Sequence, residues 1–560
     1  MKTSLSHHII DSLVSCGVKT VCIAPGSRSS ELTAAAVREE KLTKCVHFDE
    51  RALAFYAYGV AKSSKCPVAI ITTSGSAVGN LLPAVMEAFH ERVPLILLTA
   101  DRPTELKDVM ANQSCDQLKL FGNYVKHFTH IPANHPSLSP EWVTSTVAYA
   151  VHTATSSPYG PVHMNCEFRE PFFREEVLDL HTTPTRYEPP YLTLSQDTFK
   201  KWGKKLSSYQ KGVIVCGSMP SSSSSILFFA KHLGWPVLAD PMSGLRSEGM
   251  DDSPLIPYYN DLLKVLDSLQ PDCILHFGDK IVSKPLEKWL ATRTCSSYIV
   301  IANHPLRYDP QGIVSDRIQM DPYLFCEEVM PYLTPQASWV GKWKSLSHLV
   351  DPLMDELLVK PSEMGLIRYL HHKLPSHFSL YSSNSMPVRD IDRIFFPQKK
   401  TGTLFGQRGL SGIDGNIATA IGLKEGSQKP LVALIGDLAF LYDLSSLALI
   451  KSSLIPLILI VINNQGGGIF SFLPIAKEKD VFEPYVAAPH PYTFLHAAHL
   501  FDIPYLKLRD FSELDTIFQQ EKTVIVELSS HREENFKHHE ELSEKIQQTL
   551  LLSPSFQSLR

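Results

Sequence analysis

The feature that most constrains the fold is a pair of apolar segments, each followed directly by polar residues. The segment 431–435 leads into a Gly-Asp pair that ends at Asp437, and the segment 456–462 leads into an Asn-Asn pair that ends at Asn464. The two polar residues are 27 positions apart, which is enough for a strand, a helix and a second strand. In a parallel sheet such a unit brings both carboxyl ends to one edge, where α/β proteins bind ligands. The sequence therefore predicts a ligand site on a parallel sheet.

The chemistry of this edge favours a divalent metal and a phosphate group. A carboxylate and an amide oxygen are hard ligands of the kind that Mg²⁺ takes in proteins. Gly466, Gly467 and Gly468 follow at once, so the backbone can come close to a pyrophosphate. The same residues also fit an ordinary buried unit in which the aspartate caps a helix and the asparagines form a turn. The motif alone does not separate these two interpretations.

A similar pattern occurs near the start of the chain. The apolar run that begins at Pro67 precedes one at Pro94 by 27 residues, and the run at Pro430 precedes one at Pro456 by 26. Each interval is expected to hold a small-residue loop and an amphipathic helix. The shared spacing predicts two copies of one fold on either side of a different middle part.

The length of 560 residues is too great for one core and fits about three or four domains. Uninterrupted apolar strands favour parallel sheets that are covered on both faces. We therefore predict an α/β protein of three doubly wound parallel-sheet domains, with a Pro-rich linker at 172–190. The expected domains are 1–175, 190–340 and 350–560, and the strands expected in the first two are 21–24, 68–71, 95–98, 212–217, 273–278 and 298–301.

Composition excludes several function classes. With 44% hydrophobic and 20% charged residues and a net charge of −5, the chain has no basic field for nucleic acid. No segment approaches the roughly 18 apolar residues of a membrane helix, and the start lacks the apolar core of a signal peptide. The ten cysteines include no C-x-x-C pair, which favours reduced thiols. These features predict a soluble cytoplasmic protein, and the charged, His-rich run 531–539 is expected to be a solvated helix face rather than a metal site.

Several short motifs occur in one order along the chain. They are Pro25-Gly26-Ser27-Arg28-Ser29, Asp49-Glu50-Arg51, Thr73-Ser74-Gly75-Ser76-Ala77, Thr99-Ala100-Asp101-Arg102-Pro103, Ala111-Asn112-Gln113, Arg408-Gly409, Ser411-Gly412-Ile413-Asp414-Gly415, Gly436-Asp437-Leu438 and Asn463-Asn464-Gln465-Gly466-Gly467-Gly468-Ile469-Phe470. Together they resemble the thiamine diphosphate-dependent synthase family of menaquinone biosynthesis that makes 2-succinyl-5-enolpyruvyl-6-hydroxy-3-cyclohexene-1-carboxylate. The resemblance runs from about residue 20 to about residue 475 and is weakest in the middle.

The resemblance implies a set of cofactor residues. Glu50 is expected to press its carboxylic acid against the aminopyrimidine of thiamine diphosphate, although an acidic residue here also fits helix capping. Asp437, Asn464 and the Gly466 carbonyl are expected to bind Mg²⁺ or Mn²⁺, and Ile413 to bend the cofactor. The other residues expected at the cofactor or the reacting carbon are Gln113, Ser76, Gly436, Leu438, Ile469 and Phe470. Ser76 stands where we expect Thr, and Leu438 where many thiamine enzymes have Gly.

The resemblance also implies two dicarboxylate substrates, 2-oxoglutarate and isochorismate, and a decarboxylation followed by a conjugate addition. Guanidinium groups suit carboxylates because they bind them in a bidentate way. Arg389 is the expected partner of the oxoglutarate side-chain carboxylate, and Lys284 is expected to reach the acceptor. Ser27 and Arg28 are expected to take part in catalysis together with Glu50 and Gln113. The remaining residues expected at the substrates are Arg28, Arg102, Gln113, Asn384, Ser385 and Arg408.

In this family the acid-bearing block of one subunit faces the diphosphate-binding block of another, so we expect a homodimer or a homotetramer. Three alternatives remain open at this stage. The chain can be another thiamine diphosphate carboligase or 2-oxo acid decarboxylase, similar to acetolactate synthase, or a non-catalytic homologue. A nucleotide-binding Rossmann protein is disfavoured because no G-x-G-x-x-G motif follows a first strand.

Overall fold

The computed structural model describes residues 5–133, 138–173, 182–190, 192–219, 224–250, 253–266, 270–293, 295–450, 453–520 and 522–557. The chain forms two compact units, each assembled from separate stretches of sequence. The first unit contains residues 1–190, 407–431 and 439–457, and the second contains 191–406, 432–438 and 458–560. Among the described helices, none is long and apolar enough to cross a bilayer.

The first unit is built on a six-stranded sheet in the order β2-β1-β3-β4-β6-β5, and all of its neighbouring strands pair in parallel. Its central strands are buried along their whole length, which is why the sequence shows uninterrupted apolar runs there. The strands are β1 (Thr20–Ile23), β2 (Thr43–Val46), β3 (Val68–Thr72), β4 (Leu95–Asp101), β5 (Phe128–Ile131) and β6 (Val162–Glu167).

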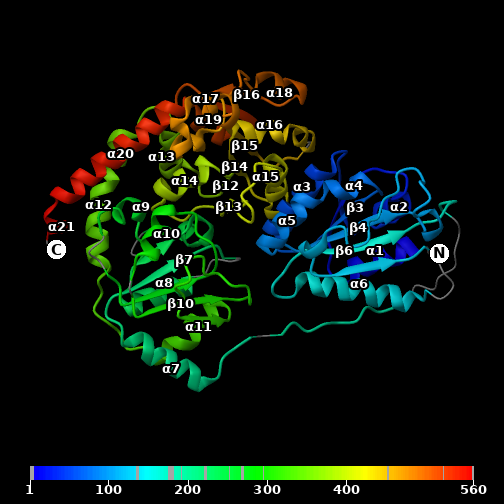
Figure 1. Ribbon diagram of the computed structural model, residues 1–560, viewed down its shortest axis with the longest axis horizontal. Helices are drawn as coiled ribbons and strands as arrows, with labels where there is room; N and C mark the ends of the chain where they lie inside the picture. Colours follow the sequence, from blue (N-terminus) through cyan, green and yellow to red (C-terminus); the bar gives the residue numbers. More distant parts are fainter. Residues whose placement is uncertain are drawn as a thin grey trace. The chain divides into compact units, whose positions relative to one another are not determined.

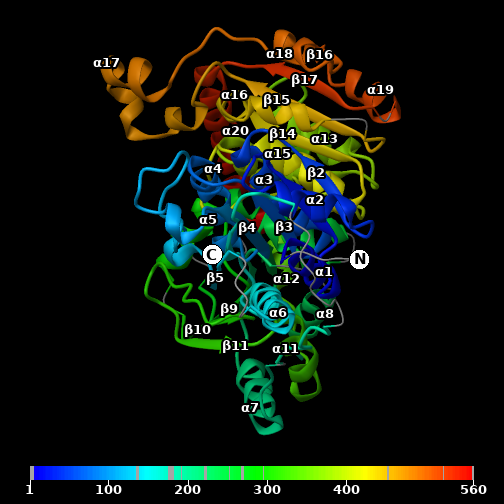
Figure 2. The same cartoon turned by 90° about the vertical axis from the view of Figure 1, so that its right-hand side faces the viewer.

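Helices cover both faces of this sheet, and Figures 1 and 2 show α3 and α6 on opposite sides of it. The face under α1, α2 and α6 encloses one continuous apolar cluster. The helices are α1 (Leu5–Ser15), α2 (Ser30–Arg38), α3 (Glu50–Ser64), α4 (Ser76–Asn80), α5 (Leu82–Glu91), α6 (Pro140–Thr155) and α15 (Asn416–Ser427), with the short 3₁₀ turns Thr104–Leu106, Gly122–Tyr124 and Leu444–Leu449.

Helices α3 and α15 pack against each other at unusually short range within the first unit. A Cβ atom on Gly59 would lie 2.4 Å from the Thr419 carbonyl oxygen, and one on Gly422 would lie 2.1 Å from the Tyr56 carbonyl oxygen. Only glycine permits two helix backbones to approach this closely. A segment from near residue 420 is thereby fixed to the helix that begins at Glu50.

The second unit contains two sheets. The five-stranded sheet has the order β11-β10-β9-β7-β8 and is parallel throughout. The six-stranded sheet has the order β13-β12-β14-β15-β17-β16, with parallel pairs β12–β13, β15–β17 and β16–β17. The strands are β7 (Gly212–Cys216), β8 (Val237–Ala239), β9 (Cys273–Phe277), β10 (Ser297–Ala302), β11 (Asp316–Gln319), β12 (Ser379–Ser382), β13 (Leu404–Gly406), β14 (Leu431–Gly436), β15 (Leu457–Asn463), β16 (Tyr505–Lys507) and β17 (Val524–Ser529).

The helices of the second unit alternate with these strands, as expected for doubly wound sheets. They are α7 (Gln196–Ser207), α8 (Ser224–Leu233), α9 (Tyr259–Leu262), α10 (Lys284–Ala291), α11 (Pro322–Val329), α12 (Val340–Leu357), α13 (Glu363–Lys373), α14 (Met386–Ile394), α17 (Lys479–Val481), α18 (Leu495–Leu500), α19 (Glu513–Gln520), α20 (Arg532–Leu552) and α21 (Pro554–Gln557). Shorter turns lie at Pro241–Ser243, Leu245–Glu248, Met330–Tyr332, Gly468–Phe472, Pro474–Lys477 and Phe482–Val486.

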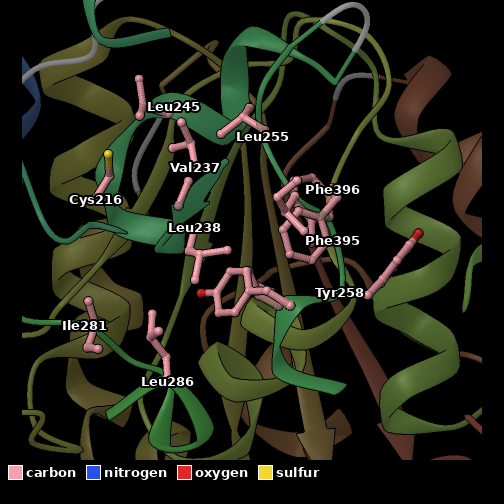
Figure 3. Packing of buried hydrophobic residues seen from close by; sticks show 14 of the residues in the cluster. Cys216, Val237, Leu238, Leu245, Leu255, Tyr258, Ile281, Leu286, Phe395 and Phe396 are labelled. Carbon is pink, nitrogen blue, oxygen red and sulfur yellow. The ribbon is translucent and has the colours of Figure 1, made fainter. Parts of the chain in front are cut away.

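One apolar cluster runs through both sheets of the second unit, and Figure 3 shows the part of it that includes Tyr258, Phe395 and Phe396. A buried ion pair joins the same region, because Arg246 Nη2 lies 2.6 Å from Asp392 Oδ1. Arg246 also donates to the Ala239 carbonyl at 2.7 Å, so its charge is well satisfied. Helix α14, which carries Arg389, is therefore held firmly against the five-stranded sheet.

The predicted α/β class with three doubly wound parallel-sheet parts is confirmed. The predicted strands are present. Their ends differ by at most one residue from the prediction, except that the strand predicted at 95–98 continues three residues further, to Asp101. In the interval between β14 and β15, α16 (Asp437–Tyr442) begins directly after β14. The linker residues 174–181 and the serines 221–223 lie outside the described residues. The division into domains at 1–175, 190–340 and 350–560 stays a prediction.

Candidate active site

Asp437 is the first residue of α16 and lies at the carboxyl end of β14 in the second unit. Its side chain is buried, with 2% of its surface exposed. Oδ2 accepts a hydrogen bond from the Gly466 backbone N–H at 2.9 Å, and His490 Nε2 lies 3.2 Å from the same oxygen. Burial raises the pKa of Asp437, and these donors offset part of the rise. A buried carboxylate whose pKa stays raised despite these donors suits a cation.

Asn464 follows β15 at the neighbouring strand end and is also buried. Its Nδ2 donates to Glu363 Oε1 at 3.0 Å. Its Oδ1 is buried and has no hydrogen-bond partner among the described residues. Because the amide nitrogen is engaged by a carboxylate, the amide oxygen is left to face another ligand.

Glu363 is the residue that orients this amide, and the sequence analysis missed it. It begins α13 and lies fully buried, and its Oε1 also accepts from Ser530 Oγ at 2.6 Å. Burial and the charge of Asp390 raise the pKa of Glu363 to about 7. In the sequence Glu363 follows Ser362, so it resembles an ordinary first-turn acid, and only the tertiary contact distinguishes it.

The backbone around Gly466 turns sharply between the two strand ends. The Gly467 N–H donates to the Ala487 carbonyl at 2.7 Å, and the Gly468 N–H donates to the Gly466 carbonyl at 3.0 Å. Ile469 and Phe470 follow on the 3₁₀ turn Gly468–Phe472 and are both half-buried. Leu438 donates its backbone N–H to Asp437 Oδ1 at 2.7 Å, so it helps to orient that carboxylate.

The His-rich run lies at the start of α20, and two of its residues, Asn535 and His539, do not face solvent as expected. His539 is mostly buried, and its Nε2 lies 3.1 Å from Asp390 Oδ1, so the expectation of a wholly solvated face is wrong at this position. His531 and His538 line a cavity of about 310 Å³ beside Glu363 and Ser530. Among the described residues, no group of three or more His, Cys, Asp or Glu side chains is arranged to hold a metal ion.

The predicted substrate residues of the second unit lie beside two different sheets. Asn384 and Ser385 follow β12, and Ser385 adopts a positive φ of 70° at the start of α14. Arg389, one turn later, donates from Nη1 to the Ser385 carbonyl at 2.5 Å, so the three residues are brought together. Lys284 begins α10 near the five-stranded sheet, where it is exposed and pairs with Glu287 at 2.5 Å.

In the first unit, Glu50 is the first residue of α3, but it is not the cap of that helix. Asp49 occupies the cap, because its side chain accepts from the Ala52 N–H at 3.1 Å. Glu50 is half-buried, and its Oε2 lies 3.4 Å from Asn80 Nδ2, at the end of α4. The carboxyl group of Glu50 is therefore available for a role other than capping.

Two arginines lie close together at the carboxyl ends of β1 and β4. Arg28 is buried and donates to the Phe168 carbonyl at 2.8 Å and to Glu170 Oε1 at 2.9 Å. Arg102 is also buried and donates to Ser74 Oγ. Burial and the charge of Arg28 lower the pKa of Arg102, as expected of two neighbouring cations. Such a pair suits an anion.

Gln113 is connected to the same place, because its Nε2 donates to the Ser74 carbonyl at 3.0 Å. Ser27 and Ser76 are both exposed. Ser27 precedes Arg28 in the chain, and Ser76 begins α4 after the short loop that follows β3. The structure thus brings Arg28, Arg102 and Gln113 to one edge of the first sheet. Arg408 and Ile413 lie on the loop before α15 in the same unit, and 43% of the Ile413 surface is exposed.

Three family models match the chain. They are described as "Thiamine pyrophosphate enzyme, N-terminal TPP binding domain" for residues 3–120, "Middle domain of thiamine pyrophosphate" for residues 185–381 and "Thiamine pyrophosphate enzyme, C-terminal TPP binding domain" for residues 390–527. A solved structure of benzoylformate decarboxylase from Polynucleobacter necessarius aligns with a TM-score of 0.70 over 95% of this chain and 99% of that one. Its sequence identity is 18%, so it supports the fold alone. The three family models, together with the fold, place the chain in the class of thiamine pyrophosphate enzymes.

Curated relatives narrow this class. A 2-succinyl-5-enolpyruvyl-6-hydroxy-3-cyclohexene-1-carboxylate synthase from Rubrobacter xylanophilus is 36% identical over 95% of this chain and 96% of its own. Proteins of the same name from Chlorobium phaeobacteroides and Bacillus velezensis are 37% and 35% identical, over 96% and 97% of this chain and 96% and 98% of their own. The chain belongs to the family of 2-succinyl-5-enolpyruvyl-6-hydroxy-3-cyclohexene-1-carboxylate synthases.

Proposed function

We propose that the chain uses thiamine diphosphate to decarboxylate 2-oxoglutarate and to add the remaining four-carbon succinyl unit to isochorismate. One proton is consumed, and the products are 2-succinyl-5-enolpyruvyl-6-hydroxy-3-cyclohexene-1-carboxylate and CO₂. The observation that carries this proposal is the sequence identity of 36%, over 95% of the chain, to a synthase of that name. The paired arginines of the first unit support it, because both substrates are dicarboxylates.

The proposal assigns a divalent cation, Mg²⁺ or Mn²⁺, to Asp437, Asn464 and the Gly466 carbonyl. The residues fit such an ion, because Asn464 Oδ1 is buried without a partner among the described residues and Asp437 is a buried carboxylate. The cation would link the protein to the diphosphate of the cofactor. Thiamine diphosphate, when bound, supplies the carbanion chemistry that no protein side chain can provide.

The chain's own residues would then bind and orient the cofactor and the substrates, and one of them would hold a proton. Glu50 would hold a proton at its carboxyl group toward the pyrimidine ring of the cofactor, and Ile413 would fix the cofactor's bend. Arg28 and Arg102 would orient a substrate carboxylate, with Gln113 beside the reacting carbon. Arg389 would bind the side-chain carboxylate of 2-oxoglutarate, and Arg408 and Lys284 would contact the second substrate.

We also propose that the functional form is a homodimer or a homotetramer in which the acid-bearing part of one copy meets the diphosphate-binding part of another. The support is the family resemblance together with the placement of Glu50 and Asp437 in different compact units. Sedimentation of the active protein tests this. A monomer that retains full activity at high dilution would contradict the shared site.

The direct test of the function is a two-substrate assay with the product identified by mass. The protein with thiamine diphosphate and Mg²⁺ is incubated with 2-oxoglutarate, with and without isochorismate. The expected result is the coupled product with both substrates and release of CO₂ that depends on 2-oxoglutarate. Release of CO₂ from pyruvate or benzoylformate instead would favour a different carboligase or decarboxylase, and failure to bind the cofactor by calorimetry would favour a non-catalytic homologue.

Arg389→Ala is expected to raise the KM for 2-oxoglutarate about 10- to 100-fold, because a charge-assisted hydrogen bond contributes about 1.5–3 kcal/mol. The KM for isochorismate should change less than about 3-fold. Steady-state kinetics with each substrate varied in turn measures both values. Arg307→Ala is the control, since this arginine is exposed and forms an ion pair with Asp309 at 3.6 Å, away from α14 in the sequence. An equal rise in both KM values would contradict the assignment.

Glu363→Met is expected to weaken Mg²⁺-dependent cofactor binding about 10- to 100-fold, because the Asn464 amide would lose the acceptor that fixes its direction. Glu363→Gln should keep near-normal binding, since its carbonyl oxygen can accept the same two hydrogen bonds. Calorimetric titration of the apoprotein with Mg²⁺ and thiamine diphosphate measures the difference without turnover. Equal affinities for the two variants would show that Glu363 does not orient Asn464.

A further inference from the structure

Two carboxylates of α5 hold the loop that carries Arg408, although they lie more than 300 positions away in the sequence. Glu87 Oε1 accepts from the Gly409 N–H at 2.7 Å, and its Oε2 accepts from the Leu410 N–H at 2.7 Å. Glu91 Oε1 accepts from the Arg408 N–H at 2.5 Å. Three consecutive backbone donors are thus bound by two side chains of one helix.

These bonds are strong because they are buried and charge-assisted. Glu87 is 2% exposed, and a carboxylate that accepts two backbone N–H bonds has no rotational freedom left. Glu91 is paired with Lys62, which also donates to Tyr58 at 3.1 Å. Burial and the charge of Glu91 raise the pKa of Glu87, whereas Lys62 lowers the pKa of Glu91. A helix would not need a buried acid at this cost for its own stability.

The backbone contact at Gly409, the second of the three donors, is close enough to exclude any side chain there. A Cβ atom on Gly409 would lie 2.9 Å from the Glu87 carbonyl oxygen and 3.0 Å from its carboxyl carbon. Glycine at 409 and glutamate at 87 therefore form one complementary pair. The contact depends on both residues, which are 322 positions apart in the chain.

The far end of the loop is fixed independently. Gln407 donates from Nε2 to the Asp414 carbonyl at 3.0 Å and accepts from Thr419 Oγ1 at 3.0 Å. The first turn of α15 is capped by Asp443, whose Oδ2 accepts from the Ala418 N–H at 2.9 Å. The segment 408–413 consequently spans two rigid supports, α5 and α15. Its only side chains with a proposed role in the reaction are Arg408 and Ile413.

We propose that Glu87, supported by Glu91, is a positioning residue that sets Arg408 for its substrate through the backbone of the loop. This inference rests on the proposed function. It adds to that function two acids that contact neither substrate nor cofactor themselves.

The test compares Glu87→Gln with Glu40→Gln, an exposed glutamate of the same unit that serves as the control. In Glu87→Gln one oxygen becomes an NH₂ group, which cannot accept from a backbone N–H and turns a donor toward one. The expected result is amide hydrogen exchange at Gly409 and Leu410 that is at least 10-fold faster than in the wild type. The control should exchange at the wild-type rate.

Kinetics supplies the second measurement. Glu87→Gln is expected to raise the KM of the substrate bound by Arg408 about 10-fold while kcat falls less than about 3-fold. In an Arg408→Ala background the same change should add less than about 2-fold, because residues that act as a unit are not additive. Additive effects, or unchanged exchange at Gly409 and Leu410, would overturn the inference. The exchange measurement needs no substrate. Unchanged exchange in Glu87→Gln would therefore overturn this inference alone, whereas a wild type that fails to make the coupled product would overturn the proposed function.

Discussion

Replacing Glu50 by Gln lowers turnover about 10²- to 10⁴-fold while cofactor affinity changes less than about 3-fold. This range is the usual contribution of a positioned acid or base. Gln has the size of Glu and can still accept from Asn80, but it cannot hold and release a proton. The fold should be unaffected, because Asp49 and not Glu50 caps α3. Single-turnover rates and calorimetric cofactor titration measure the two effects separately.

Asp49→Asn is the matched control for this prediction. It removes the neighbouring carboxylate, and asparagine caps helices as well as aspartate does. Its turnover should stay within about 3-fold of the wild type. If Asp49→Asn lost as much activity as Glu50→Gln, the effect would come from the charge at the helix start. Near-normal turnover of Glu50→Gln would remove Glu50 from the proposed chemistry.

Replacing Asp437 by Ala abolishes retention of the cofactor, with an expected loss of more than about 100-fold in affinity. Partners of metal ligands already contribute 10- to 100-fold, so a ligand itself should contribute more. The substitution also leaves the Gly466 N–H without its acceptor at 2.9 Å, which loosens the backbone that should face the diphosphate. Calorimetry with thiamine diphosphate at saturating Mg²⁺, and with Mg²⁺ omitted, measures the loss.

The fold of this variant must be checked apart from its binding. The apoprotein should unfold within a few degrees of the wild type, because the change also removes a buried charge whose pKa is raised by burial. Asp197→Ala, at an exposed position of α7, is the control and should bind the cofactor normally. Wild-type affinity in Asp437→Ala would contradict the cation site at this strand end.

The sequence predicted the sheets because their apolar runs are local and uninterrupted. The runs at 68–71 and 431–435 need no partner to be recognised as buried parallel strands, and both are strands in the structure. The order of the motifs likewise indicated the thiamine diphosphate family. The sequence could not give Glu363 or Glu87 a role, because each resembles an ordinary helical glutamate. Their partners, Asn464 and Gly409, lie 101 and 322 positions away.

The sequence by itself determined the α/β class, the strand ends that carry polar residues and the residue types available there. Each of these follows from the spacing of apolar and polar residues within a few turns of chain. Only the tertiary structure decided that Asp49 caps α3, that His539 turns inward to Asp390, and that α5 holds the backbone at Gly409. The physical reason is that burial and hydrogen-bond partners belong to pairs of residues, and here the partners come from segments that the chain brings together only when it folds.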